Sequence, residues 1–205
     1  MSFGDESRGR SPAKRRAVLE GIGVAVGFML VGAVASFGLW RSSVASLRAQ
    51  LDDELVRLAS VGAGLVDPEL HASFRDPGQL DSEPYLRAIE PLRRFRDHAP
   101  GVKYVYTAVR KGEVVHFVLD AAEPSDNDGD GREDRAAIDE TYDDCEDAIH
   151  LAFGSDDLPG RAVSSPEPYT DEWGTFITGY APIHDDAGAV IAVIGVDVMA
   201  DRFIE

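Results

Sequence analysis

The sequence predicts an α+β domain, an antiparallel sheet with helices mainly on one face, preceded by one transmembrane helix. Three patterns along the 205 residues predict this class. An uncharged run lies near the N-terminus, two segments with a helical apolar period follow it, and from residue 102 the period changes to that of β-strands. Helices followed by paired strands are typical of an α+β fold with an antiparallel sheet.

The uncharged run is Gly21–Trp40, directly behind the basic stretch Lys14-Arg15-Arg16. At about 1.5 Å per residue, it spans the roughly 30 Å hydrocarbon core of a bilayer. The alternative is a cleaved signal peptide that ends at Ala33-Val34-Ala35. The apolar run continues past that site to Trp40, which favours a retained anchor.

The basic flank of a membrane span stays on the cytoplasmic side. We therefore expect residues 1–16 to form a cytoplasmic basic tail and residues 17–40 the transmembrane helix. Residues 41–205 then form one extracytoplasmic, periplasmic domain of a single-pass protein of the inner or plasma membrane.

Charge and cysteine content restrict the partners. Residues 21–205 hold 15 basic and 34 acidic side chains, which argues against binding to nucleic acid or to an anionic lipid surface. Cys145 is the only cysteine, so an intramolecular disulfide is excluded. We interpret Cys145 as a small buried hydrophobic residue.

Two helices are expected before the sheet. The first, of roughly 25 residues and continuous with the span, carries an apolar stripe of Val44, Leu47, Leu51, Leu55, Leu58, Val61 and Leu65. That stripe packs on the domain's own sheet, forms a homodimer seam near the membrane, or does both. Asp67-Pro68 should end this helix. The second begins near Ser82 and stops at His98-Ala99-Pro100-Gly101.

The strands follow as two hairpins. Val102–Arg110 and Glu113–Asp120 are joined by the turn Lys111-Gly112, and Gly174–His184 and Ala189–Met199 by residues 185–188. Between the hairpins we expect a long segment with a short helix at about Tyr142–Phe153. This segment covers the second face of the sheet, where a small-molecule pocket can form.

Several motifs in this order carry a resemblance to a known family. They are Val102-Lys103-Tyr104-Val105-Tyr106-Thr107, Phe117-Val118-Leu119-Asp120, Trp173-Gly174-Thr175-Phe176, Gly179-Tyr180-Ala181-Pro182-Ile183 and Val193-Ile194-Gly195-Val196-Asp197. Over roughly residues 42–200 the chain resembles the Cache family of extracytoplasmic sensor domains, which have a PAS-like sheet and occur in bacterial receptors.

The resemblance implies a single Cache domain that binds a small metabolite and takes part in signal transduction, without catalysis of its own. Such domains typically continue into a second span and a histidine kinase, chemoreceptor or nucleotide-cyclase module. This sequence closes at Glu205, just after the last strand. The expectation is therefore either the N-terminal part of such a receptor or a stand-alone sensor.

Strand parity selects the candidate ligand site. Gly195 and Asp197 share one face of the last strand, Thr178 and Tyr180 one face of the strand before it. The full set of candidates is Tyr104, Tyr106, His116, Asp120, Trp173, Thr178, Tyr180 and Asp197. Along the strand Glu113–Asp120, the same alternation predicts that His116, Val118 and Asp120 share one face. Aromatic walls with carboxylates suit an amine or the ammonium group of an amino acid. The alternative for each residue is ordinary core packing or capping.

One departure from the family bears on the ligand. Amino-acid-binding members carry an arginine two positions before the tryptophan to hold the α-carboxylate. Here that position is Asp171, and the nearest upstream arginine is Arg161. The sequence therefore favours a cationic ligand without a carboxylate over an amino acid.

An acidic segment forms a second candidate site, for Ca²⁺. Asp126, Asp128 and Asp130 alternate before a glycine, as at the start of a calcium loop. An EF-hand needs Glu at position twelve, where Ala137 stands, so closure falls to Asp134, Asp139 or Glu140. The alternative is a solvated acidic turn. If the metabolite site is absent, the competing function is an anchored interaction or scaffold protein stabilised by calcium.

Catalysis finds little support in the sequence. The five histidines, His71, His98, His116, His150 and His184, lack ligand spacing, and there is no nucleophile or phosphate-binding motif.

Overall fold

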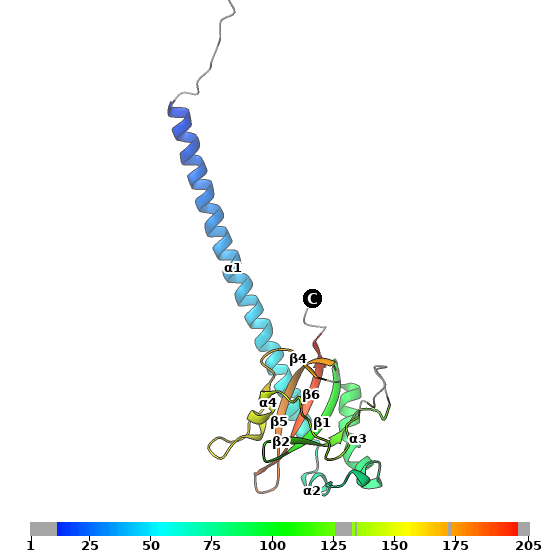
Figure 1. Ribbon diagram of the computed structural model, residues 1–205. Coiled ribbons are helices and arrows are strands. Elements are labelled where there is room, and N and C mark those ends of the chain that lie inside the picture. The colour runs from blue at the N-terminus through cyan, green and yellow to red at the C-terminus, as the bar shows by residue number, and fades with distance from the viewer. Residues whose placement is uncertain (1–11, 126–132, 134, 172–173, 201–205) are drawn as a thin grey trace, which may run out of the picture. The chain divides into compact units, whose positions relative to one another are not determined.

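The computed structural model describes residues 12–125, 133, 135–171 and 174–200 (Figure 1). Its contacts divide the chain into two units, Met1–Ala49 and Gln50–Glu205. Among the described residues, the second unit holds every strand and every helix after the first. The predicted α+β class, an antiparallel sheet with a long N-terminal helix, is confirmed.

Helix α1 (Pro12–Ala63) begins in the first unit. From Leu19 onward it is long and apolar enough to cross a bilayer, and its most apolar window is not buried against any described residue. Large apolar side chains there are exposed, such as Phe28 and Trp40 at 76% and 63%. In water such exposure is unfavourable, so this part of α1 has the surface of a segment that faces lipid.

Within the second unit, α1 packs on the sheet. Leu55 and Ala59 are fully buried, whereas Val61 and Leu65 are about half exposed, so the predicted stripe faces two environments. The helix ends at Ala63, a few residues before the predicted stop. Asp67 instead caps α2 (Pro68–Ala72), where its side chain accepts a hydrogen bond from the Leu70 amide.

A short 3₁₀ turn, η1 (Pro77–Gln79), leads to α3 (Glu83–His98). The Ser82 hydroxyl caps α3 by accepting from the Tyr85 amide, as the sequence predicts for a helix that starts near Ser82. Tyr85, Ile89 and Leu92 are the buried face of this helix.

The sheet is antiparallel. Its strands are β1 (Val102–Lys111), β2 (Val114–Asp120), β3 (Val163–Ser164), β4 (Tyr169–Asp171), β5 (Gly174–His184) and β6 (Val190–Met199). The order is β2-β1-β6-β5-β3, and β4 also pairs with β5. Both predicted hairpins form, with Gly112 and Gly188 at positive φ in their turns.

The two faces of the sheet have different cores. On the face toward α1 and α3, the helix face, aliphatic residues such as Val105, Ile194 and Val196 pack together. On the opposite face, the tyrosine face, Tyr106, Tyr142 and Tyr180 form a cluster with residues of α4. Figure 1 shows α3 and α4 on opposite sides of the sheet.

Helix α4 (Asp147–Phe153) is shorter than predicted. The expected start at Tyr142 is wrong, because Tyr142 precedes the helix and packs on the tyrosine face instead. Cys145 is only partly buried beside the same cluster. Cys145 is therefore less buried than predicted.

Helix α1 touches the sheet backbone to backbone at Gly179. A side chain at Gly179 would overlap the main chain of Leu55, so only glycine allows this approach. Nearby, the Ser164 hydroxyl donates to Asp52 at 2.9 Å. Strand β5 and its neighbour β3 are thereby held directly on α1.

Candidate ligand-binding site

The tyrosine face centres on β6, between β1 and β5. Asp197 lies opposite Tyr104 on one side and Thr178 on the other. One step along, Gly195 lies opposite Tyr106 and Tyr180. Cross-strand partners share a face of the sheet, so the register brings these six residues together as two adjacent rows.

A chain of hydroxyl groups leads to the carboxylate. Thr178 Oγ1 donates to Asp197 Oδ1 at 2.6 Å, a short, charge-assisted bond. Tyr169 Oη lies 3.2 Å from Thr178 Oγ1 and 3.0 Å from Tyr142 Oη. Tyr169 comes from β4 and Tyr142 from the segment before α4, so with β5 and β6 four separate parts of the chain meet at this network.

Tyr106 is held against the middle strand by Gly195. A Cβ at Gly195 would overlap the Tyr106 ring, so the ring packs directly on the β6 backbone. The ring also makes edge contacts with Phe117 and Tyr142. Tyr106 is 4% exposed, and its hydroxyl has no hydrogen-bond partner among the residues that the structure describes. Most buried hydroxyl groups in proteins have a hydrogen-bond partner, so this one is an exception.

The electrostatics of the site are those of a buried anion. Asp197 is 3% exposed. Burial raises the pKa of Tyr106, Tyr169 and Tyr180 well above the usual value, and the negative charge of Asp197 raises all three further. The phenols therefore stay protonated at neutral pH, and the potential at their hydroxyl groups is negative.

Five of the predicted candidates come together here: Tyr104, Tyr106, Thr178, Tyr180 and Asp197. Tyr104 packs edge-on against Phe176 beside the carboxylate, with ring centroids 5.6 Å apart. Trp173 lies outside the described residues. The prediction that these residues bind a ligand stays a prediction.

His116 and Asp120 do not share a face, and that prediction is wrong. The β1–β2 register shifts between Thr107 and Ala108, so Asp120 lies opposite Tyr106 while His116 lies opposite Val109. An irregularity of this kind reverses the parity of all residues beyond it. His116 Nδ1 instead lies 3.1 Å from the Asp139 carbonyl oxygen, away from Asp197.

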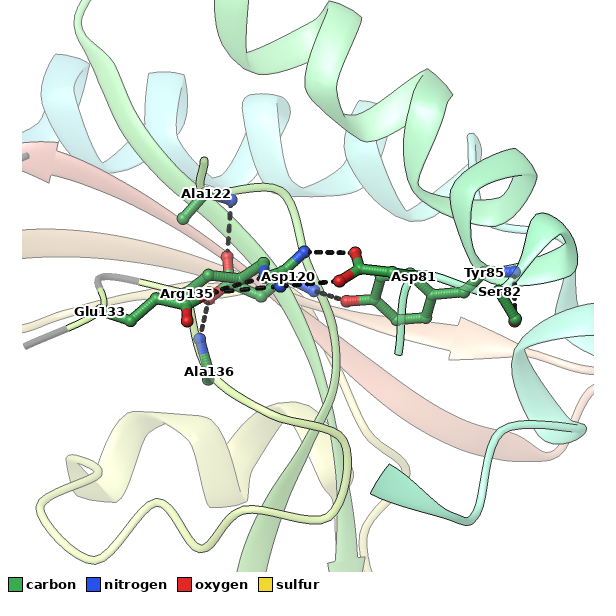
Figure 2. A network of polar contacts seen from close by, with 8 residues as sticks. All are labelled: Asp81, Ser82, Tyr85, Asp120, Ala122, Glu133, Arg135 and Ala136. Atoms are coloured by element: carbon green, nitrogen blue, oxygen red, sulfur yellow. Dashed lines mark hydrogen bonds and ion pairs between the residues drawn. The ribbon is translucent and has the colours of Figure 1, made fainter. Parts of the chain in front are cut away.

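Asp120 holds two stretches of backbone (Figure 2). Its carboxylate accepts hydrogen bonds from the amides of Ala122 and Ala136, at 2.8 and 2.7 Å. Its own amide donates to Tyr85 Oη at 3.3 Å. Burial raises the pKa of Asp120 to about 6, and the two amide donors oppose that rise. With both oxygens engaged, Asp120 has the contacts of a structural residue.

Arg135 extends this network to the start of α3. Its guanidinium group makes a two-pronged contact with the carboxylate of Asp81, at 2.7 and 3.3 Å, and also contacts Glu133 (Figure 2). Bidentate pairs of this kind fix geometry as well as charge. The network thus joins the end of β2, the segment after it and the first turn of α3.

The predicted calcium ligands Asp126, Asp128, Asp130 and Asp134 lie outside the described residues. Within the described part of the chain, no group of three or more carboxylate, histidine or cysteine side chains is placed to hold a metal ion. Two of the residues expected to close a calcium loop have other contacts. Asp139 pairs with Lys111, and Glu140 accepts from the Ala137 amide.

Sequence reasoning missed Tyr142 and Tyr169 as site residues. Neither residue was predicted to lie on a strand, so strand alternation could not place it beside Asp197. Both belong to the long connection between β2 and β5, and the way this connection folds over the sheet brings them to the site. The one available signal is that both are aromatic residues in an otherwise polar segment.

Comparisons with known proteins give structural neighbours only. No family model and no curated protein matches the chain. The chain is similar to the periplasmic sensory domain of the Campylobacter jejuni chemoreceptor Tlp1, at 15% identity and a TM-score of 0.42, over 73% of this chain and 54% of that one. It is also similar to the ligand-binding domain of the Campylobacter jejuni chemoreceptor Tlp3 in complex with 4-methylisoleucine, at 17% identity and a TM-score of 0.39, over 73% and 59%.

A further structure of the sensory domain of the Campylobacter jejuni chemoreceptor Tlp3 matches at 18% identity and a TM-score of 0.38, over 77% of this chain and 64% of that one. This chain thus spans between 54% and 64% of these structures. All three structures are sensory or ligand-binding domains of chemoreceptors. A likeness of this extent assigns no ligand to the chain.

Proposed function

We propose that the chain is a membrane-anchored extracytoplasmic sensor domain of the single-Cache type, and that its tyrosine face binds a small organic cation. One observation carries the proposal: a buried carboxylate, Asp197, lies among tyrosines whose rings and hydroxyl groups it makes electrostatically negative. Ammonium groups are bound by such combinations of carboxylate and aromatic faces.

The arrangement supports binding rather than catalysis. The tyrosines of the site have pKa values raised by burial, so they do not exchange protons near neutral pH. Thr178 already donates its hydroxyl hydrogen to Asp197. The one hydroxyl that this network places against a carboxylate belongs to Thr178, a residue with no exposed surface, so it is poorly placed to attack a substrate.

A ligand on this face can influence α1 through β5. Thr178 and Tyr180 point to the site, and Gly179 between them touches the Leu55 backbone on the other face. A shift of β5 on binding is therefore transmitted to α1 without an intervening side chain. We place the basic N-terminal tail in the cytoplasm, so that α1 carries the change toward the membrane.

The exposed apolar residues of α1 support a homodimer. Val61 of α1 is 52% exposed, and Leu65, two residues beyond the end of the helix, is 40% exposed. A second copy of α1 would remove such side chains from water.

The test uses thermal unfolding of the full chain in detergent micelles, followed by circular dichroism. The panel holds primary amines, quaternary ammonium compounds, amino acids and carboxylates of matched size. A ligand at about 100 times its dissociation constant stabilises by about 2.7 kcal/mol, a shift of several degrees. We expect amines to raise the midpoint.

Asp197→Asn should abolish that response, because it removes the negative charge while it keeps the size of the side chain. Asp186→Asn is the matched control, since Asp186 is an exposed carboxylate on the same hairpin. If no amine shifts the midpoint, or if Asp197→Asn responds like the wild type, the proposed site is wrong.

A further inference from the structure

A cavity that Asp197 does not line is left unused by the proposed function. It has a volume of about 280 Å³ and lies at the tip of the β1–β2 hairpin, beside the start of β6 and the residues after α2. Its walls come from four parts of the chain that are far apart in sequence. We call it the hairpin cavity.

The floor of the hairpin cavity is apolar. Phe74, Val118 and Ile138 line it, and each is buried to at least nine-tenths. Val109 and Ile191 complete the apolar wall and are partly exposed. At roughly 30 Å³ for each non-hydrogen atom, the space holds a molecule of about nine such atoms. It therefore suits a small ligand with a short apolar body.

The rim of the cavity is cationic. Arg75, Arg110 and Lys111 line it, against one carboxylate, Asp139. Lys111 pairs with Asp139, and this contact lowers the pKa of that carboxyl, which therefore stays ionised. The pair is neutral as a whole. The net charge of the rim is therefore that of the two arginines.

Neither arginine is neutralised by the described part of the chain. Arg75 donates to the Phe74 carbonyl oxygen at 2.9 Å, and the Arg110 guanidinium carbon lies 5.3 Å from the centre of the Phe153 ring. No carboxylate among the described residues lies within ion-pair distance of either. The sequence has 37 acidic and 20 basic residues, so most arginines would be expected to find a carboxylate partner. Two arginines at one cavity without such a partner among the described residues are therefore unusual for this chain.

We propose that the hairpin cavity binds a small organic anion with a short apolar body, at a site separate from the tyrosine face. The apolar floor takes the body and the two guanidinium groups take the anionic head, which arginine holds through paired N–H donors. Because the head lies near solvent, its attraction to the rim falls as salt is added.

The experiment is isothermal titration of the full chain in detergent micelles at low ionic strength. Butanoate is the probe, and inorganic phosphate is an anion without an apolar body. We expect saturable binding of butanoate, at least about tenfold tighter than phosphate, a difference of about 1.4 kcal/mol. No saturation by butanoate, or equal affinity for phosphate, overturns the proposal.

Variants locate the binding. The double change Arg75→Gln and Arg110→Gln should weaken butanoate binding at least about tenfold, whereas Arg87→Gln, an exposed arginine on α3, should leave it unchanged. Ile191→Phe fills the cavity and keeps its charges, so it should also weaken binding. Unchanged affinity in the double variant overturns the site, and unchanged affinity in a folded Ile191→Phe protein overturns the cavity as its location.

The two sites are separated by Asp197→Asn. That change should remove the response to amines and leave butanoate binding intact, because Asp197 does not line the hairpin cavity. In the wild-type chain, absence of the amine response alone overturns the proposal for the tyrosine face, and absence of butanoate binding alone overturns the proposal for the hairpin cavity.

Discussion

The two faces of the sheet are built from the same strands but differ in what they bury. Along β6, Ile194 and Val196 face α1 and α3 and are fully buried among aliphatic side chains. The residues that alternate with them, Gly195 and Asp197, face a set of tyrosines. The helix face thus gains hydrophobic stabilisation, whereas the tyrosine face buries a carboxyl group and a hydroxyl that has no partner among the described residues, at a cost to stability.

The helix face therefore contributes to stability, and the tyrosine face is the one that we propose binds a ligand. Each face also holds a buried titratable group whose pKa is shifted toward the range that a pH experiment can reach. On the helix face, His71 Nε2 lies 2.8 Å from Thr107 Oγ1, and both residues are 1% exposed or less. Asp120, opposite Tyr106, belongs to the other face. Four experiments, in order from the largest expected effect to the smallest, test whether the two faces differ in this way.

Ile194→Ala should give the largest loss. Deleting a fully buried aliphatic side chain removes its transfer free energy and leaves a cavity, which costs roughly 2–5 kcal/mol. Urea unfolding of the full chain in micelles, followed by near-UV circular dichroism, measures it. The amine affinity of the folded variant should stay within about threefold of the wild type. A much larger change in affinity would mean that the faces are not separate in function.

Acidification should weaken the helix face through His71. Burial, and then the charge of Arg75, lower the pKa of His71 to about 4, against about 6.5 in the unfolded chain. The unfolded state therefore takes up a proton first, and stability present above pH 6.5 is lost as the pH falls toward 4. The contribution is roughly 3 kcal/mol. His71→Gln should flatten that part of the pH profile, and an unchanged slope would contradict the assignment.

Asp120 should act in the opposite direction. Its pKa is raised to about 6 in the folded protein, above the usual value of 3.8, so the native state holds this proton more tightly than the unfolded chain does. The contribution is full below about pH 4 and is lost as the pH rises through 6, by roughly 2–3 kcal/mol. The free energy of unfolding of wild type minus Asp120→Asn should therefore fall between pH 4 and pH 7. An increase over that range would contradict it, and Asp186→Asn is the control.

Two neighbouring residues of β1 give the smallest and sharpest test. Thr107→Val leaves His71 and the Leu119 amide without the hydroxyl that both contact, which costs about 1–3 kcal/mol. Tyr106→Phe removes a hydroxyl without a partner among the described residues, so stability should change by less than about 1 kcal/mol. Amine binding should respond in the reverse order, with a loss only in Tyr106→Phe. Equal effects on binding would remove the distinction between the faces.

Most elements and half of the site could be predicted from the sequence. Ser82 marks the start of α3, and Lys111-Gly112 marks the first hairpin. The two-residue alternation placed Thr178, Tyr180, Gly195 and Asp197 on one face. These features depend on residues close together in the chain, and local propensity and period describe them well.

Contacts between distant parts of the chain could not be predicted in this way. The pairing of β1 with β6, the arrival of Tyr142 and Tyr169 beside Thr178, and the bond between His71 and Thr107 all join segments that no local pattern relates. The irregularity at Thr107 and Ala108 belongs here too, since one unpaired residue reverses the side of every residue beyond it.

The sequence by itself therefore determined the apolar N-terminal helix, the α+β class and the alternation that separates an apolar face from a polar one. Only the tertiary structure decided which tyrosines surround Asp197, that Asp120 holds backbone instead of joining them, and that Arg75 and Arg110 meet at one cavity. The physical reason is the distance along the chain over which the interacting residues are spread. Periodicity follows from the geometry of one helix or strand, whereas a site is made where several such elements pack together.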